Sequence, residues 1–271
     1  MNAVYLVQER PGFPLHQACA DCASHDWCLP AGLDAKERKL LDRLSVHTRF
    51  IGRGGIVYRS GAAFNSLYAI RSGFVKSTIT LDDGRERVTG LYMHGELIGM
   101  DAINTGKYMC EAVALEDSSV CAIPFDELEC LTRDIPALQQ YLHRVMSREI
   151  AHDYGVMLLL GSMRAEERVA VFLVSLSKRY AALGYSPTRI NLRLKRDEIG
   201  SYLGLKLETV SRVLSRFQED RLIAVQHKDV EIKDLDRLNR MIGNHHDVHR
   251  VASGVTRARS SAPVQSVLQC A

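Results

Sequence analysis

Residues 195–223 constrain the fold of this chain most, because a short apolar pattern occurs there twice around one glycine. In the first stretch Ile199, Tyr202 and Leu203 mark one face of a helix, and Gly204 then interrupts the pattern. The second stretch has apolar residues at i, i+3, i+4 and i+7, namely Val210, Val213, Leu214 and Phe217. Two short helices joined by a tight turn form a helix-turn-helix, so the sequence predicts a DNA-binding unit here.

Three polar residues share the opposite face of the second predicted helix. Glu208, Ser211 and Arg212 stand at i, i+3 and i+4, pointing away from the apolar stripe. An Arg can donate twice to guanine, a Glu can accept from cytosine N4, and a Ser can serve either way. Side chains near the start of a recognition helix reach the base edges. We therefore expect these three to read DNA bases; the alternative is an ordinary solvated helix face.

The segment LGLKLETVSRVLSRFQ, residues 203–218, resembles the recognition element of the Crp/Fnr superfamily of bacterial transcription regulators. Members of that family usually have Ser or Thr at the position of Lys206, where a side-chain oxygen caps the helix. They usually have Gly at the position of Arg221, which suits a left-handed residue after the helix. Both departures concern local stability, and they leave the three expected reading residues unchanged.

Length and composition allow two domains with separate cores, since the chain has 271 residues, 46% hydrophobic and 25% charged. No signal segment opens the chain and no run of about eighteen apolar residues occurs, so we expect a cytoplasmic protein without a membrane partner. The net charge is only +3. Between Pro187 and Val230, however, nine Lys and Arg stand against six Asp and Glu. This mild bias suits phosphate contacts, although it is equally common on solvated surfaces.

The seven cysteines point to metal rather than to disulfides, because their number is odd and the expected compartment is reducing. Cys19, Cys22 and Cys28 form a C-x2-C-x5-C motif. Closely spaced thiolates can wrap around one soft metal centre, either zinc or an iron–sulfur cluster. Unrelated buried thiols are the third interpretation. Three thiolates leave such a site one ligand short, so the fourth must come from a distance.

The sequence around Cys121, ALEDSSVCAIPF, resembles the segment that supplies the fourth ligand in the oxygen-sensing FNR branch of the superfamily. The resemblance covers about residues 15–240 and includes LYAIRSG, ITLDDG and GELIGMDAI. It implies a [4Fe–4S] cluster held by Cys19, Cys22, Cys28 and Cys121. Cys110 is the competing fourth ligand, and we expect Cys130 and Cys270 to be plain thiols.

Residues 33–133 predict a jelly-roll β domain, because many short strands are separated by glycine turns. Asp83-Gly84 is a hairpin signal between two such strands. In the cyclic-nucleotide branch of the superfamily an Arg-Ser pair after the GE-x-x-G turn grips the phosphate, and residues 95–99 are followed by no such pair here. Cyclic nucleotide is therefore disfavoured. Haem, which some relatives use, stays open, with His47, His94 and His143 as possible ligands.

The stretch from Pro136 to about Leu160 predicts one long helix with an apolar stripe. Such a stripe requires a partner helix to cover it. A second copy of the chain is the simplest partner, and this predicts a homodimer on a palindromic operator with half-sites about 34 Å apart. The expected interface consists of Leu142, Val145, Met146, Ile150, Asp153 and Met157. Asp153 is the one charged residue in this stripe, so two carboxylates would meet across an otherwise apolar seam.

The chain is thus divided into a Cys-rich segment (1–32), a β-roll sensory domain (33–133), a dimerisation helix (134–162), a winged helix-turn-helix domain (163–240) and a poorly ordered tail (241–271). The fold class is α+β.

We expect a regulator, not an enzyme, in which the cluster favours the dimer and oxygen inactivates it. The resemblance implies a TTGAT-like inverted repeat and RNA polymerase contacts at Arg71, Ser72 and Gly84. The alternatives are a regulator of this fold with haem or zinc as effector, or an iron–sulfur redox protein, although no Walker, dinucleotide or zincin motif occurs.

Overall fold

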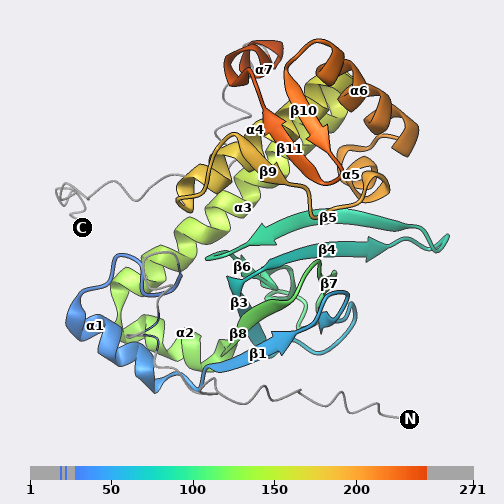
Figure 1. The fold of residues 1–271 in the computed structure, drawn as a ribbon. Coiled ribbons are helices and arrows are strands. Elements are labelled where there is room, and N and C mark those ends of the chain that lie inside the picture. Colours follow the sequence, from blue (N-terminus) through green and yellow to red (C-terminus); the bar gives the residue numbers. More distant parts are fainter. Residues whose placement is uncertain (1–18, 20–21, 23–27, 243–271) are drawn as a thin grey trace, which may run out of the picture.

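The computed structural model describes residues 19, 22 and 28–242, and it consists of two lobes joined by one long helix (Figure 1). The N-terminal lobe begins with α1 (Ala35–Leu40), which Asp34 and Glu37 start with a capping box, and continues with a 3-10 turn (Leu41–Arg43). Its strands are β1 (His47–Ile51), β2 (Ile56–Tyr58), β3 (Ser66–Ser72), β4 (Phe74–Thr80), β5 (Glu86–Met93), β6 (Leu97–Ile98), β7 (Glu111–Ala114) and β8 (Ser118–Pro124).

The strands form two four-stranded sheets in the described part of the chain, with the orders β1-β8-β3-β6 and β2-β7-β4-β5. Each pairing within them is antiparallel, which confirms the predicted jelly roll. The hairpin expected at Asp83-Gly84 joins β4 to β5: Leu81 N donates to Arg85 O at 2.9 Å, and Gly84 has φ +82°. A left-handed residue is what such a turn requires, and glycine adopts it without strain.

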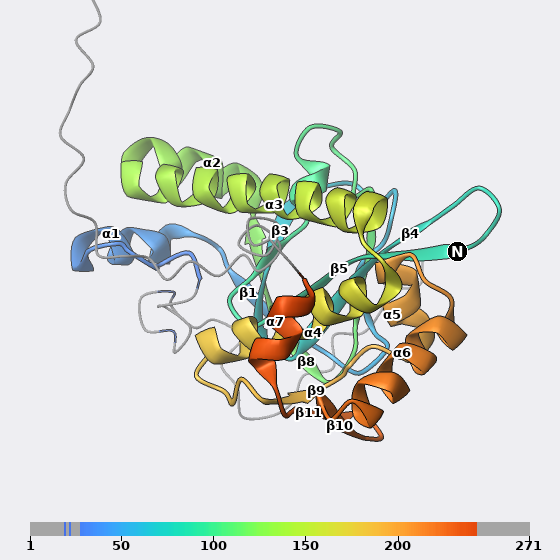
Figure 2. The same ribbon diagram turned by 90° about the horizontal axis from the view of Figure 1, so that it is seen from above.

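The long helix predicted from Pro136 is present as α3 (Pro136–Ser162). It follows α2 (Phe125–Asp134) after a break at Ile135 and turns away from it (Figure 1), and in the view from above it runs across the molecule (Figure 2). Pro136 occupies its first turn, where a missing N–H costs nothing. A short 3-10 turn (Met100–Ala102) lies between β6 and β7. Helix α3 leads directly from the β lobe to the C-terminal lobe, so it connects the predicted sensory domain to the predicted DNA-binding domain.

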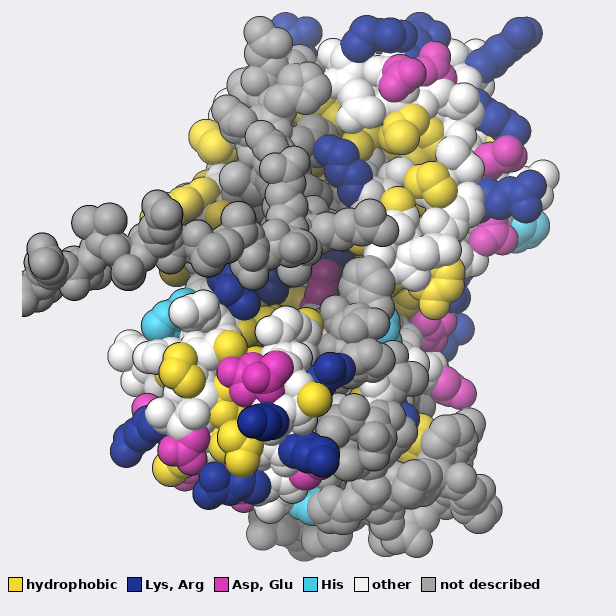
Figure 3. Space-filling view, turned by 90° about the vertical axis from the view of Figure 1, so that its left-hand side faces the viewer, with side chains coloured by type: hydrophobic (Ala, Val, Ile, Leu, Met, Phe, Trp, Pro, Cys, Tyr) yellow, Lys and Arg dark blue, Asp and Glu magenta, His cyan; other side chains and the backbone are white. Residues whose placement is uncertain are grey.

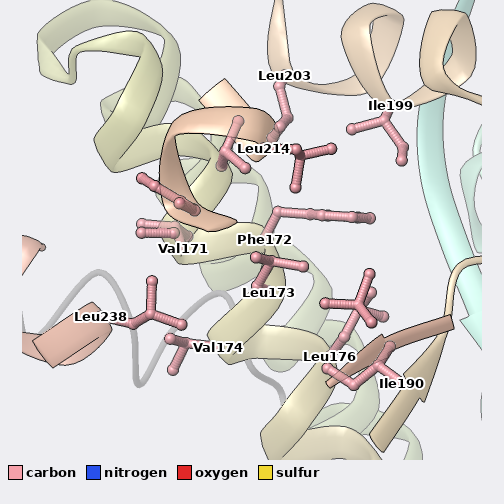
Figure 4. Close-up of a cluster of buried hydrophobic side chains, with 14 of the residues drawn as sticks. Val171, Phe172, Leu173, Val174, Leu176, Ile190, Ile199, Leu203, Leu214 and Leu238 are labelled. Atoms are coloured by element: carbon pink, nitrogen blue, oxygen red, sulfur yellow. The ribbon is translucent and has the colours of Figure 1, made fainter. Parts of the chain in front are cut away.

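The C-terminal lobe is a winged helix-turn-helix. Its elements are α4 (Ala165–Ala182), β9 (Arg189–Asn191), α5 (Arg196–Leu203), α6 (Leu207–Glu219), β10 (Ile223–Gln226), β11 (Asp229–Ile232) and α7 (Leu235–Met241). The wing is a three-stranded sheet of order β10-β11-β9. Side chains of α4 such as Phe172, Leu173 and Leu176 lie at the centre of the core, between the apolar sides of α5, α6 and the wing (Figure 4).

The two lobes do not have fully separate cores, which corrects the sequence expectation. Leu91 and Met93 of β5 belong to the same buried cluster as the α4 residues, such as Phe172. The reason is that part of β5 turns its side chains toward the C-terminal lobe instead of toward the interior of the jelly roll. Separation of the lobes would therefore expose apolar area, and their relative position is coupled to the packing of β5.

Within the described residues no helix is both long and apolar enough to span a bilayer. The expected tail lies outside the described residues from position 243 onward, as do Cys270 and most of the segment 1–32.

Candidate metal centre and DNA-reading face

Three of the four predicted cysteine ligands pack against one buried core. Cys121 lies on β8, in register with Thr48 of β1 and Ala69 of β3. Cys19 and Cys28 pack on the same hydrophobic cluster as Cys121. Leu29, next to Cys28, is almost fully buried in that cluster and so anchors the cysteine segment to the β lobe. The fold thus brings the N-terminal motif to a residue about a hundred positions away in the chain.

The four thiols also interact electrostatically. Burial, followed by the thiols of Cys121 and Cys22, raises the pKa of Cys19 to about 12. Burial raises the pKa of Cys28 and of Cys121 as well, and thiols of this cysteine set contribute to both shifts. Thr48 Oγ1 lies 3.9 Å from Cys121 Sγ and partly offsets the shift of that residue. Without a metal, the thiols of Cys19, Cys28 and Cys121 are therefore protonated at neutral pH.

The donor set fits a soft metal group, since it offers four thiols, none of which is in a disulfide. Across the described positions, however, no three His, Cys, Asp or Glu side chains are arranged to hold one ion. A single zinc ion requires sulfurs about 3.8 Å apart, given Zn–S bonds of about 2.3 Å, whereas a four-iron cluster is larger and tolerates wider spacing. The cysteines are gathered, but not in the compact arrangement of a one-ion site.

The competing ligand Cys110 lies elsewhere. Its sulfur is 3.7 Å from Thr89 Oγ1, and Asp101 is a neighbouring charge. Burial raises the pKa of Cys110, Thr89 acts in the opposite direction, and Asp101 and Asp153 add to the rise. Cys130 is exposed on α2. The structure therefore groups Cys121, and not Cys110, with the N-terminal cysteines.

Aromatic side chains fill part of the interior of the jelly roll. The rings of Tyr58 and Tyr108 stack with centroids 4.1 Å apart, and Tyr68 packs beside them. Tyr108 Oη donates to Ser66 O at 2.7 Å, which fixes the stack. His94, one of the residues considered for haem, lies with Nδ1 2.6 Å from Arg71 O.

The predicted reading residues lie together on the exposed side of α6. Glu208, Ser211 and Arg212 are exposed, and the apolar side of the helix, with Val210 and Phe217, is buried in the lobe core. Lys206 gives no side-chain cap, as its residue type predicts. Figure 3 views the molecule from the left-hand side of Figure 1, and on this face Lys and Arg side chains lie mainly along the upper and right-hand edges of the upper body.

Two glycines set the angle between α5 and α6. Gly204 ends α5 in the left-handed conformation, at φ +64°. Gly200, which the sequence analysis did not single out, allows close approach: a Cβ there would lie 2.6 Å from Leu205 O. A glycine four residues before the turn glycine was the available signal.

The predicted dimer stripe on α3 is only partly exposed. Ile150 and Met157 are exposed, the latter at 64%, and Leu142 and Met146 are partly buried. Val145, however, is only 6% exposed and packs in the core of its own chain, so its assignment to the interface is wrong. The sequence analysis missed the exposed apolar residues Tyr154 and Leu158.

Asp153 is exposed, at the margin of this apolar face. It precedes Tyr154 by one residue and therefore points about 100° away from it around the helix. Its charge also reaches its own chain, because Asp153 contributes to the raised pKa values of Glu149 and Cys110. Its role in a dimer stays a prediction.

Of the residues expected to contact polymerase, Arg71 and Ser72 line a groove of about 840 Å³ between the β lobe and the wing. Gly84 is at the exposed tip of the β4–β5 hairpin.

Comparison with known proteins agrees with this architecture. The family described as Crp-like helix-turn-helix domain matches residues 167–241, and the cyclic nucleotide-binding domain family matches residues 48–134. The transcriptional activator protein Anr of Pseudomonas protegens is 43% identical over 83% of this chain and 92% of the relative. The fumarate and nitrate reduction regulatory protein of Escherichia coli is 41% identical over 85% of this chain and 92% of the relative.

Among solved structures, FixK2 from Bradyrhizobium japonicum superposes with a TM-score of 0.67 at 27% identity, over 73% of this chain and 98% of that one. These relatives are regulators and not enzymes, and the helix-turn-helix and the family imply DNA binding and dimerisation. The chain therefore belongs to the Crp/Fnr family of DNA-binding transcription regulators.

Proposed function

We propose that this chain is an oxygen-responsive transcription regulator whose [4Fe–4S] cluster is held by Cys19, Cys22, Cys28 and Cys121. The observation that carries the proposal is the gathering of Cys19 and Cys28 with Cys121 at one buried core, where Cys121 and Cys22 add to the raised pKa values of Cys19 and Cys28. It is supported by the similarity to the transcriptional activator protein Anr and to the fumarate and nitrate reduction regulatory protein. An iron–sulfur cluster supplies a group that oxygen degrades.

The chain's own residues account for the coupling to DNA. The buried thiols must lose protons to become ligands, so metal loading releases protons and strengthens as pH rises. The same core that carries Cys28 also carries Leu138 and Val145 of α3, so the order of the cysteine segment and the position of α3 are linked. A bound group that favours one position of α3 shifts the monomer–dimer equilibrium by its differential affinity.

In this proposal the dimer places two α6 helices on a TTGAT-like inverted repeat, and Arg71, Ser72 and Gly84 contact RNA polymerase. The compartment is the cytoplasm.

The cofactor assignment is tested by iron and sulfide content after anaerobic purification, together with an absorption spectrum. Cys121→Ala and Cys28→Ala should lose both elements, because a thiolate cage missing one ligand loses geometry as well as affinity. Cys110→Ala and Cys130→Ala are the matched controls and should keep them. Iron retained by Cys121→Ala but lost by Cys110→Ala would show that the fourth ligand is misassigned, and a haem spectrum or zinc alone would replace the cofactor.

The reading role is tested separately with Arg212→Ala and Glu208→Ala on operators substituted one base pair at a time. Each should cost about 1–3 kcal/mol at its cognate base pair and relax the preference there. A loss that is even across all sequences, with a shallower salt dependence, would mean a phosphate contact instead.

A further inference from the structure

A group of four polar side chains joins the two lobes to α3. We call it the junction cluster: Glu96 from the turn between β5 and β6, Glu149 from α3, Arg179 from α4 and Tyr202 from α5. Each comes from a different element, so the cluster touches the β lobe, the long helix and the helix-turn-helix at once. The proposed cofactor site does not involve any of these residues.

Arg179 is fixed to the β lobe by short hydrogen bonds. Its Nη2 donates to Glu96 Oε2 at 2.6 Å and to Leu91 O at 2.6 Å. Glu96 Oε2 is itself held, because Met93 N donates to it at 2.9 Å. The Arg179 side chain is only 12% exposed, so this pair is screened little by solvent. The guanidinium of Arg179 on α4 is therefore held in one position against β5.

The junction contains a second carboxylate that interacts with the same cation. The charges of Glu149 and Arg179 affect each other, and Glu96 repels Glu149. Arg179 Nε is buried and makes no hydrogen bond within the described part of the chain. A buried donor without a partner requires a reason. Arg179 also lines one small cavity together with Gly155 and Leu159 of α3 and Tyr202 of α5, so the cation that Glu96 holds lies where these elements meet.

The first helix of the helix-turn-helix is held on β4 and β5 beside this cluster. Val88 N donates to Ser201 Oγ at 2.9 Å, and Lys76 Nζ lies 2.7 Å from Glu198 Oε1 in a pair that is mostly buried. Tyr202 reaches α3, with its hydroxyl 3.4 Å from His152 Nε2. These contacts of α5 with the β lobe and with α3 therefore fix the position of α6 relative to α3.

We propose that Arg179 is a positioning residue that couples α3 to the DNA-binding lobe. Through Glu96 and Leu91 it fixes α4 on the β lobe, and at the cavity that it shares with Gly155 and Leu159 it makes this position depend on α3. In a dimer both α6 helices must match two half-sites at a fixed spacing. If α4 is not held in one position, specific DNA binding weakens, whereas the attraction of the lobe to phosphates is unchanged. This role rests on the DNA binding in the proposed function, but it does not require the iron–sulfur cluster.

The test uses the full chain, purified anaerobically, on an operator that the unaltered protein selects from a random-sequence pool. Arg179→Met should weaken binding to this operator by about tenfold to a hundredfold, the equivalent of one charge-assisted hydrogen-bonded pair. Binding to a duplex of unrelated sequence should change by less than about twofold. Lys178→Met, which removes a charge from the next and exposed position of α4, is the matched control and should leave the ratio of the two affinities unchanged.

Two further variants separate positioning from general stability. Arg179→Lys keeps the charge and should recover part of the specific affinity, and Glu96→Gln, which keeps the shape, should lose it like Arg179→Met. The effects of Arg179→Met and Glu96→Gln should not add in the double variant, because they remove one interaction. If Arg179→Met does not fold, the pair of Glu96→Gln and Glu149→Gln carries the test.

Unchanged specific affinity, equal losses on both duplexes, or fully additive effects would each overturn the inference. A wrong cofactor assignment leaves the test intact, because the unaltered protein itself chooses the operator.

Discussion

Arg221 is a single residue at which this sequence departs from what its backbone requires. It has φ +57°, directly after α6, where Leu222 N donates to Phe217 O at 2.8 Å and closes the helix end. The left-handed conformation costs a residue with a Cβ about 1 kcal/mol relative to glycine. We expect Arg221→Gly to raise the free energy of unfolding by about that amount, measured by urea denaturation. Arg221→Ala removes the charge but keeps the Cβ, so equal stabilisation by both would point to charge instead.

Glu149 makes stability depend on pH. Burial, followed by the charges of Glu96 and Asp153, raises its pKa to about 7, although Arg179 and Arg148 act in the opposite direction. The folded chain therefore holds a proton that the unfolded chain has lost between about pH 4.5 and pH 7. Its contribution to stability falls as pH rises through this window and is constant above it.

The matched comparison is the unaltered chain against Glu149→Gln in urea at several values between about pH 4.5 and pH 8. The difference should grow in favour of the variant by up to about 1.4 kcal/mol per pH unit within the window. A difference independent of pH would mean that Glu149 is not protonated in the folded state.

At the scale of elements, the helix-turn-helix could be predicted from local pattern alone. Its apolar spacing and Gly204 fix the two helices, and the residue types explain the missing cap at Lys206. The face of α3 could not be predicted as well. Periodicity identifies apolar residues, but it does not tell whether Val145 packs within its own chain or Tyr154 stays exposed, because that depends on where the β lobe covers the helix.

Asp153 gives the α3 element a testable brake on dimerisation. If two copies pair through the exposed face with Ile150 and Met157, the two Asp153 carboxylates approach each other. At a separation of about 6 Å and an effective dielectric of about 20, they repel by roughly 3 kcal/mol. The charge of Asp153 also acts within its own chain, where it opposes the deprotonation of Glu149 and Cys110.

We therefore expect Asp153→Ala to dimerise and bind its operator in air. Sedimentation of the aerobic variant measures this, with Asp126→Ala on the exposed side of α2 as a control for charge removal. A variant that stays as monomeric as the unaltered protein at the same concentration would show that Asp153 is not the brake.

At the scale of the whole molecule, the two candidate sites differ in how far the sequence predicts them. The cysteine spacing indicated a metal, and only the resemblance selected Cys121 over Cys110; the structure then groups Cys121 with Cys19 and Cys28. The junction cluster had no local signal, because Glu96, Glu149 and Arg179 are far apart in the chain and individually ordinary. Such a cluster arises only when two lobes meet, and no periodicity encodes that meeting.

The attachment of each DNA-binding lobe to α3 and β5 makes the distance between two reading helices a property of the whole dimer. Contacts such as Lys76 with Glu198 and Arg179 with Glu96 restrict the lobe, and β5 residues share its core. The dimer should therefore demand half-sites about 34 Å apart on one side of the duplex. Inserting about five base pairs between them turns one half-site to the opposite side.

We expect that insertion to lower the affinity at least about a hundredfold, to the level of a duplex with one half-site destroyed, because only one lobe can then read its bases. Fluorescence anisotropy on the three duplexes at one salt concentration measures this. An insertion that costs less than about tenfold would mean that the lobes turn freely on α3, and the contacts on β5 would then not fix the spacing of the reading helices.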